Sequence, residues 1–366
     1  MKSRIRVAEF VFPGHPDKLA DAVADSIVRE AMRRDRRARV SVEVSLYRNT
    51  VFITGRVACP DAESIDLDTI ARSVFRSAGY CELFPPAPAD VQVQADVHLV
   101  PLTEQEIESR GAACDQAVVT GFACSTPGTG FLPVEHAIAA RLSRRLGSLH
   151  TARPDLDLGP DGKLIVFVEE SADGESWRVR DVSVSAQHSV SCDRVDLRRA
   201  IHGETLAELD AMAGEVPGLG VSDDWSLVVN GAGDFSTGGA FGDNGQTGRK
   251  LVIDFYGPRV PIGGGALSGK DFYMVDRAGA ILARRLAIAG VQRLGLRECL
   301  VTLAIRPGDR AFRIVDVASA GRTIEDERLR NLCDLSLEAT GDAVAADLDS
   351  AQAMFGTLHQ RVSVPV

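Results

Sequence analysis

Strand-like segments of this chain come in adjacent pairs, and helix-like segments follow the pairs instead of alternating with single strands. Val40, Val42, Val44 and Leu46 alternate with polar residues, and after a turn at Asn49 a second alternating segment covers residues 51–57. This alternation predicts a β-hairpin with one buried face. Similar pairs occur at residues 163–169 with 179–185 and at 300–305 with 310–317. Paired strands favour an α+β fold, in which helices cover one face of mixed or antiparallel sheets.

The expected helices are recognised by apolar residues at helical spacing. The first begins at Pro16, a residue suited to a first helical turn, and continues with Leu19, Val23 and Ile27. Further helices are expected at residues 62–78, 133–146, 197–212 and 275–290, and further strands at 91–97 and 225–230. The polar stretch 103–114 contains a glycine and predicts a loop.

Three aspartates recur at a spacing of four residues along the first expected helix. Asp17, Asp21 and Asp25 therefore share one helix face. Taken alone, such a pattern predicts a solvated acidic face, stabilised near its start by the helix dipole.

Composition excludes several classes of protein. The chain has 366 residues, which predicts two or three domains, and its net charge of -10 argues against a non-specific nucleic-acid binder. Its seven cysteines form no C-x-x-C pair, so neither a zinc site nor a disulfide scaffold is indicated, and reduced cytoplasmic thiols are expected. The N-terminal residues lack a cleavage signal, and no apolar run reaches the roughly 18 residues of a membrane helix.

Two glycine-rich loops, each with Lys or Arg near its end, point to a polyphosphate ligand. Residues 242–250 read G-D-N-G-Q-T-G-R-K and residues 263–271 read G-G-G-A-L-S-G-K-D. Glycines let backbone N–H groups approach phosphates closely, and Lys and Arg neutralise them. Asp243 adds a candidate metal ligand. A pair of ordinary turns with solvated cations is the alternative.

The second loop also matches part of a P-loop pattern. Gly264 and Gly269 have the P-loop spacing and Lys270 follows them, but the next residue is Asp271 instead of Ser or Thr. No strand directly precedes this loop and no helix is expected directly after it, as a P-loop requires. The P-loop interpretation is therefore the weaker one.

A third candidate segment precedes the first helix. Residues 14–18, G-H-P-D-K, place a histidine, a carboxylate and a cation at a helix N-terminus, which attracts anions through its unpaired N–H groups. Asp17 is a candidate Mg²⁺ ligand. By itself, this segment is better explained as a helix cap with surface charges.

Together these segments resemble the signature motifs of the S-adenosylmethionine synthetase (methionine adenosyltransferase) family. Shorter matches follow in the family's order across nearly the whole chain: R-V-S-V-E at 39–43, C-D-Q at 114–116, P-D-G-K at 160–163, A-Q-H-S at 186–189 and V-D-R at 275–277. The resemblance implies three similar α+β domains around a pseudo-threefold axis, here residues 1–101, 111–222 and 223–366. It also implies a homodimer or a dimer of dimers, with active sites at the subunit interface.

The implied reaction is attack by a thioether sulfur on C5′ of ATP. The displaced triphosphate is then hydrolysed to PPi and Pi. A triphosphate leaves only if its growing charge is stabilised, which two Mg²⁺ ions and fixed cations provide. The implied partners are ATP and a small sulfur-containing substrate, with no nucleic acid and no membrane.

The resemblance also implies roles for individual residues. His15 lies near the departing oxygen, Phe235 stacks on adenine beside Asp234, and Ala266 lies in the loop next to the triphosphate. Asp161 and Lys163 contact ATP, and Asp243 lies between the nucleotide and the acceptor, which Asp115 also borders. The expected catalytic groups are His15, Lys163, Arg249, Lys250 and Lys270, and the expected metal ligands are Asp17 and Asp276 for Mg²⁺ and Glu43 for K⁺.

The sequence departs from the family where the family contacts methionine. Arg56 stands where the family has a glutamate that pairs with the methionine ammonium, Leu99 where it has a glutamine, and Met274 where it has a lysine. Asp234 replaces an arginine. Because the phosphate and metal residues are kept, this pattern favours an acceptor other than methionine, with a carboxylate or phosphate near Arg56. Drift in a degenerate copy and a shifted alignment are the alternatives for the acceptor residues. A non-catalytic, nucleotide-binding homologue that partners another subunit is the alternative function.

Overall fold

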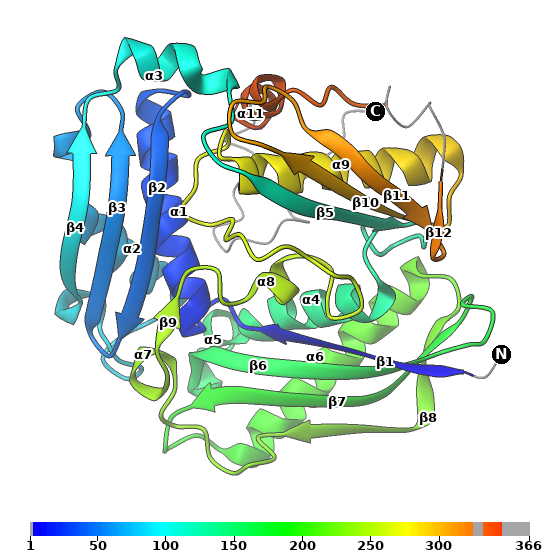
Figure 1. Cartoon of the computed structure of the whole chain (residues 1–366). Coiled ribbons are helices and arrows are strands. Elements are labelled where there is room, and N and C mark those ends of the chain that lie inside the picture. The colour runs from blue at the N-terminus through cyan, green and yellow to red at the C-terminus, as the bar shows by residue number, and fades with distance from the viewer. Residues whose placement is uncertain (1–2, 325–331, 346–366) are drawn as a thin grey trace.

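The protein is described by a computed structural model that covers residues 3–324 and 332–345. Its strands form three four-stranded sheets, and helices cover one face of each (Figure 1). The expected α+β class is confirmed. The predicted segment 223–366 extends beyond the described residues.

The first sheet has the order β4-β3-β2-β9 and is covered by α1 and α2. Its central β2-β3 pair is the predicted hairpin, with Val40 opposite Val57 and Val44 opposite Ile53, so alternate side chains face α1. β4 runs parallel to β3. The elements are α1 (Pro16–Arg34), β2 (Arg39–Tyr47), β3 (Thr50–Ala58), α2 (Leu67–Ala78), β4 (Gln92–Val100) and β9 (Gly245–Gln246).

The second sheet has the order β1-β6-β7-β8, and α4 and α6 pack on it. β6 and β7 form the expected antiparallel pair. The elements are β1 (Arg4–Val11), α4 (Val134–Gly147), α5 (Leu149–Ala152), β6 (Leu158–Glu170), β7 (Trp177–His188), α6 (Arg194–Glu215) and β8 (Leu219–Val229).

The third sheet has the order β12-β11-β10-β5, and α9 packs along β5 and β10. Its elements are β5 (Ala117–Cys124), α9 (Val275–Leu294), β10 (Glu298–Ile305), β11 (Arg313–Ser319), β12 (Arg322–Thr323) and α11 (Leu337–Ala345). Two short helices, α7 (Gly239–Gly242) and α8 (Leu251–Asp254), lie in the segment that joins the second and third sheets.

The sheets do not coincide with contiguous stretches of chain. β1 belongs to the N-terminal segment but pairs with β6, and β5 belongs to the central segment but pairs with β10. β9 pairs with β2 across about 200 residues of sequence. The boundaries at 1–101, 111–222 and 223–366 and the pseudo-threefold axis stay predictions.

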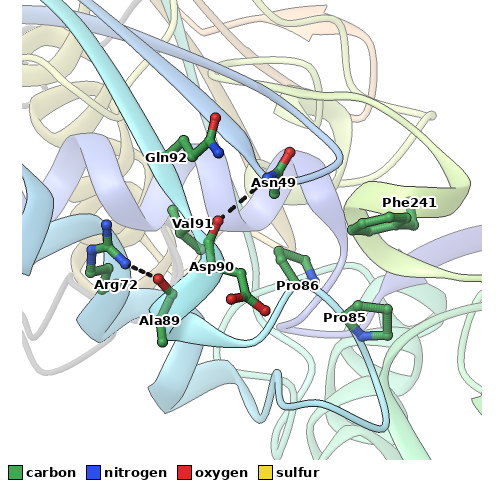
Figure 2. Close-up of a pocket in the computed structure, with 9 residues that line it drawn as sticks. All are labelled: Asn49, Arg72, Pro85, Pro86, Ala89, Asp90, Val91, Gln92 and Phe241. Carbon is green, nitrogen blue, oxygen red and sulfur yellow. Dashed lines mark hydrogen bonds between the residues drawn. The ribbon is translucent and has the colours of Figure 1, made fainter.

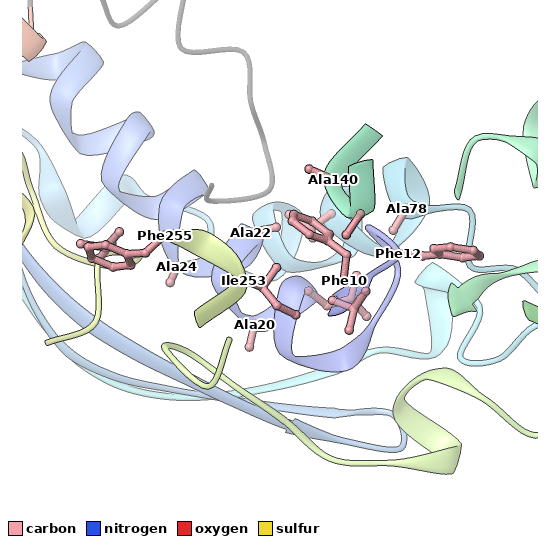
Figure 3. Packing of buried hydrophobic residues seen from close by; sticks show 14 of the residues in the cluster. Phe10, Phe12, Ala20, Ala22, Ala24, Ala78, Ala140, Ile253 and Phe255 are labelled. Atoms are coloured by element: carbon pink, nitrogen blue, oxygen red, sulfur yellow. The ribbon is translucent and has the colours of Figure 1, made fainter. Parts of the chain in front are cut away.

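Two apolar clusters hold these layers together. The larger joins the first two sheets through α1, α2 and α4, with Phe10, Phe12, Ala20, Ala24 and Phe255 among its members (Figure 3). The smaller lies between α9 and the third sheet. Because α1 packs against both other helices and strands, its apolar residues are buried all round.

The expectation of a loop at 103–114 is wrong in part. Thr103 caps a short helix, α3 (Glu104–Glu108), and a reciprocal capping box joins the Thr103 and Glu106 side chains to each other's backbone N–H groups. The sequence signal, Thr followed three residues later by Glu, was present. The expected helix at 62–78 begins later, at Leu67, where Asp66 caps it.

Candidate active site

The three aspartates of α1 are buried, so the expectation of a solvated acidic face is wrong. Asp17, Asp21 and Asp25 are 1%, 1% and 5% exposed. Each accepts a hydrogen bond from a glycine-rich loop: Asp17 from the N–H of Gln246 at 3.0 Å, Asp21 from Gly248 at 3.0 Å and Asp25 from Gly269 at 3.2 Å. We call these residues the aspartate row. The row fixes both loops to one helix.

Each aspartate of the row is also paired with a cation. Lys250 Nζ lies 2.5 Å from Asp17, Lys18 Nζ lies 2.8 Å from Asp21, and Arg277 lies 2.9 Å from Asp25. Lys18 is itself buried and contacts Asp254 at 2.6 Å. Because buried charges need partners, these ion pairs explain why the row tolerates burial.

The two glycine-rich loops touch each other at Gly248 and Ala266. Gly248 has φ +73°, and a Cβ there would lie 2.7 Å from the Ala266 Cβ. Gly269 has φ +81° and packs on the carbonyl of Val42, where a Cβ would come within 2.1 Å. Both positions therefore require glycine, for conformation and for space.

His15 caps α1 and presents a polar atom to the site. Its Nδ1 accepts the N–H of Asp17 at 3.2 Å, so in the neutral ring Nε2 carries the proton. Nε2 is buried, with no partner among the described residues. Burial, with the charges of Lys163 and Lys250, lowers the pKa of His15 to about 3. His15 is therefore a neutral donor at pH 7.

Asp161, whose pKa, like that of His15, is affected by Lys163, has a spare acceptor. Its Oδ2 accepts the N–H of Gly239 at 2.7 Å, while Oδ1 is buried without a partner among the described residues. Burial raises its pKa to about 6, although the bond from Gly239 and the charge of Lys163 act in the opposite direction.

The groups expected at the nucleotide are largely accessible. Lys163, Asp243 and Arg249 are exposed, and Arg249 donates to Asn244 at 3.1 Å. The Phe235 backbone is held by His188, whose N–H donates to the Phe235 carbonyl at 3.0 Å. Asp234 pairs with Arg194 at 2.5 Å, and both side chains are about half exposed.

Lys270 and Asp276 form a second group of site residues. Lys270 Nζ lies 2.5 Å from the Asp276 carboxylate at the start of α9. A Cβ on Gly265 would meet that carboxylate at 2.2 Å, so the loop passes close beside it. Lys270 also forms a β-bridge with Ser41 of β2, which joins this group to the first sheet.

The structure separates the residues expected at the acceptor. Arg56 lies opposite Ser41 and beside His98, in the row of the sheet that leads to Lys270, and its guanidinium lies 2.8 Å from Glu106 of α3. Leu99 pairs with Val57 and packs on the core, so it faces away from Arg56. Asp115 is exposed, and Met274 precedes α9 without a side-chain cap bond.

The carboxylates fit metal ions that are held partly by a substrate. No group of three or more His, Cys, Asp or Glu side chains in residues 3–324 and 332–345 could enclose a metal. Mg²⁺ commonly takes one or two carboxylates and completes its shell with phosphates and water. Asp17 and Asp276 are single carboxylates beside phosphate-loop cations, and Glu43 accepts a hydrogen bond from Thr247.

A separate pocket lies outside this region (Figure 2). It has a volume of about 490 Å³ and opens between residues 85–92 and the ring of Phe241. Phe241 lies two residues after Gly239, whose N–H donates to Asp161. None of the residues expected at the site lines it. Its lining residues are Asn49, Arg72, Pro85, Pro86, Ala89, Asp90, Val91, Gln92 and Phe241.

Three family models match consecutive parts of the chain. They describe the N-terminal, central and C-terminal domains of S-adenosylmethionine synthetase and match residues 3–98, 110–235 and 237–363. The chain belongs to the S-adenosylmethionine synthetase family.

Curated relatives of this family cover most of the chain. The S-adenosylmethionine synthase 1 of Rhodospirillum rubrum is 35% identical over 337 residues, which span 90% of this chain and 85% of the relative. The S-adenosylmethionine synthase of Parafrankia sp. is 31% identical over 371 residues, 95% of this chain and 90% of the relative. That of Rhodospirillum centenum is 35% identical over 346 residues, 90% of this chain and 85% of the relative.

Sequence reasoning missed the residues that hold this synthetase-like site in place. Asp21, Asp25, Lys18 and Arg277 were visible only as charges, yet all four are buried. The available signal was the set of alanines and valines on every side of α1, which is typical of a buried helix.

No helix in the described part of the chain is long and apolar enough to cross a bilayer.

Proposed function

We propose that this protein is an ATP-dependent adenosyltransferase, in which a sulfur nucleophile attacks C5′ of ATP and displaces the triphosphate. The proposal rests above all on the aspartate row, which attaches two cation-bearing glycine loops to the helix that His15 caps. Catalysis of this displacement needs stabilisation of a leaving group whose negative charge grows, and the cations of these loops match that need.

His15 acts in this proposal as a neutral hydrogen-bond donor. Its Nε2–H is buried and has no partner among the described residues, so it is available to the oxygen that departs from C5′. The ring is uncharged at pH 7, because burial and nearby cations lower the pKa of its protonated form to about 3, so it donates a hydrogen bond without adding a positive charge. Lys163, Arg249 and Lys250 contact the phosphates.

The metals of the proposal would be held by Asp17 and Asp276 for Mg²⁺ and by Glu43 for K⁺. When bound, Mg²⁺ would supply positive charge that offsets the negative charge growing on the triphosphate. The paired cations are compatible with this role, since phosphate oxygens offer Lys250 and Lys270 alternative partners to Asp17 and Asp276.

The acceptor in this proposal is a sulfur compound other than methionine. A carboxylate that could pair with the methionine ammonium is absent at position 56, and the Arg56 charge is balanced by Glu106 at 2.8 Å. A carboxylate or phosphate on the acceptor therefore competes with Glu106 for Arg56. Met274 replaces a third polar contact with an apolar side chain.

A homodimer or dimer of dimers with interface active sites completes the proposal. Light scattering of the purified protein measures its mass. A monomer that is active at nanomolar concentration would contradict this part.

Product analysis tests the chemistry. The full-length protein is incubated with ATP, Mg²⁺ and K⁺, alone, with L-methionine, and with a panel of thioethers and thiols, and products are identified by mass spectrometry. With one member of the panel we expect an S-adenosyl product together with PPi and Pi from the triphosphate. With L-methionine we expect little S-adenosyl product. Ordinary turnover with methionine would refute the altered acceptor. ATP binding without any product would favour the non-catalytic homologue.

A structure-guided reversal tests the acceptor residues. The variant R56E/E106Q/M274K restores a carboxylate and a cation without placing two carboxylates together, and leaves Leu99 in the core. We expect it to gain activity with methionine relative to the wild type. The matched control is E106Q/M274K, which keeps Arg56. Equal activity of the two variants with methionine would refute the role of position 56.

A further inference from the structure

Arg110 is a buried cation that the chemistry described so far does not use. It lies in the short 3₁₀ turn after α3 and is only 4% exposed. Its guanidinium lies 2.7 Å from the Asp271 carboxylate and 4.4 Å from the centre of the Tyr273 ring. It also donates to the carbonyls of Arg37, at 3.1 Å, and Ala38.

Asp271 is the final residue of the second glycine loop and attaches that loop to the first sheet. Its Oδ2 accepts the N–H of Val40 at 2.8 Å, and its own N–H donates to the Val40 carbonyl at 3.0 Å. Its Oδ1 accepts the N–H of Tyr273 at 2.9 Å. A P-loop would have Ser or Thr at this position. Here the Asp271 carboxylate instead accepts backbone N–H groups and fixes the path of the chain.

Lys270 lies between two such attachments. On one side Gly269 bonds to Asp25 and to Val42, and on the other side Asp271 bonds to Val40, so the Lys270 backbone is aligned along β2. The direction of the Lys270 side chain therefore depends on the orientation of the Asp271 carboxylate, which Arg110 helps to set.

The segment that carries Arg110 is also attached on the acceptor side of the site. Arg56 pairs with Glu106, and Arg39 donates to the Glu106 carbonyl at 2.9 Å and to the Ser109 hydroxyl at 2.7 Å. Residues 103–111 thus join the sheet face beside Arg56 to the loop that carries Lys270.

We propose that Arg110 is a positioning residue that orients Lys270 through Asp271 and couples the 103–111 segment to the triphosphate loop. The reading of Lys270 as a phosphate contact rests on the proposed function. Lysine cannot replace Arg110 fully, because a guanidinium donates in several fixed directions and stacks on a ring at once. Removing one partner of a buried ion pair destabilises the protein because it leaves the other charge buried and unpaired, here the Asp271 carboxylate.

The test compares R110K and R110M with the wild type in the full-length protein. The control is Arg145→Lys, since Arg145 pairs with Glu204 and Glu208 at the half-exposed contact of α4 and α6. Amide hydrogen exchange is measured over residues 263–276, 103–111 and α1. Steady-state hydrolysis of added tripolyphosphate gives kcat and KM.

For R110K we expect faster exchange in both 103–111 and 263–276, with α1 unchanged. We also expect kcat for tripolyphosphate to fall by roughly 10- to 100-fold, because a misplacement of about 1 Å costs up to about 100-fold. R110M should show larger changes in the same two segments. R145K should match the wild type in both measurements.

Two results would overturn the proposal. One is an R110K protein with unchanged exchange in 263–276 and unchanged kcat, and the other is loss of α1 protection in R110K, which would make Arg110 a general core residue. Wild-type protein that neither hydrolyses tripolyphosphate nor forms an adenosylated product would refute the proposed function instead, while the exchange comparison would still decide the role of Arg110.

Discussion

Replacing Asp25 by alanine is expected to detach the second glycine loop from α1. Asp25 contacts Arg277 at 2.9 and 3.2 Å and accepts the N–H of Gly269 at 3.2 Å, all in buried surroundings. Breaking a buried ion pair by removing one partner costs about 3–5 kcal/mol. Because Arg277 keeps the Lys270 carbonyl and the face of Phe272, at 4.6 Å, we expect a value near the lower end, about 3 kcal/mol.

Peptide-level hydrogen exchange is the suitable assay for this variant. A chain with three sheets need not unfold in one step, so a single unfolding free energy is poorly defined. We expect D25A to lose protection at residues 266–272 and at the start of α9. D25N should lose less, because its amide oxygen still accepts from Gly269. The control is D68A, since Asp68 pairs with Arg72 at an exposed site on α2 and contributes about 0.3–0.5 kcal/mol. Equal protection in D25A and D68A would refute the aspartate row as the support of the loop.

Three further predictions concern titration and capping. Because burial raises the pKa of Asp161 to about 6, the folded state binds its proton more tightly than the unfolded state, and stability falls as pH rises from about 4 to 6. In D161N the urea midpoint should therefore change less with pH over that range than in the wild type. An identical pH dependence in the two proteins would contradict this. Because the pKa of His15 is lowered to about 3 in the folded state, stability falls as pH drops below 6.5. The urea midpoint of H15N should therefore fall less between pH 7 and pH 5 than that of the wild type. T103A removes the capping box and should cost α3 about 1 kcal/mol, seen as faster exchange in residues 103–111 with α2 as the internal reference; unaltered exchange would show that Arg39 and Arg56 alone hold α3.

The sequence was most informative where one local pattern decides the structure. The alternation from Val40 to Val57 predicts the hairpin and its one buried face, and both are confirmed. The glycines at 248 and 269 signal close backbone approach, and both have positive φ and tight neighbours. The same local reasoning overlooked the capping box at Thr103, although its signal lies within four residues.

Local patterns could not show which charges are buried. Asp21 and Asp25 look like surface residues in sequence, because burial depends on what packs against the helix face. Their partners Gly248 and Gly269 lie more than 200 residues away. Likewise, Arg56 alone predicts a free cation at the acceptor, whereas Glu106 reaches it from α3.

By itself, the sequence determined the fold class, the phosphate-type loops and membership of the synthetase family, because short-range periodicity and motif order encode these directly. Only the tertiary structure decided that the aspartates of α1 hold both loops, that Leu99 faces the core away from Arg56, and that Arg110 binds Asp271. The physical reason is that buried ion pairs and sheet faces depend on long-range packing, which brings distant residues together and excludes water from between them.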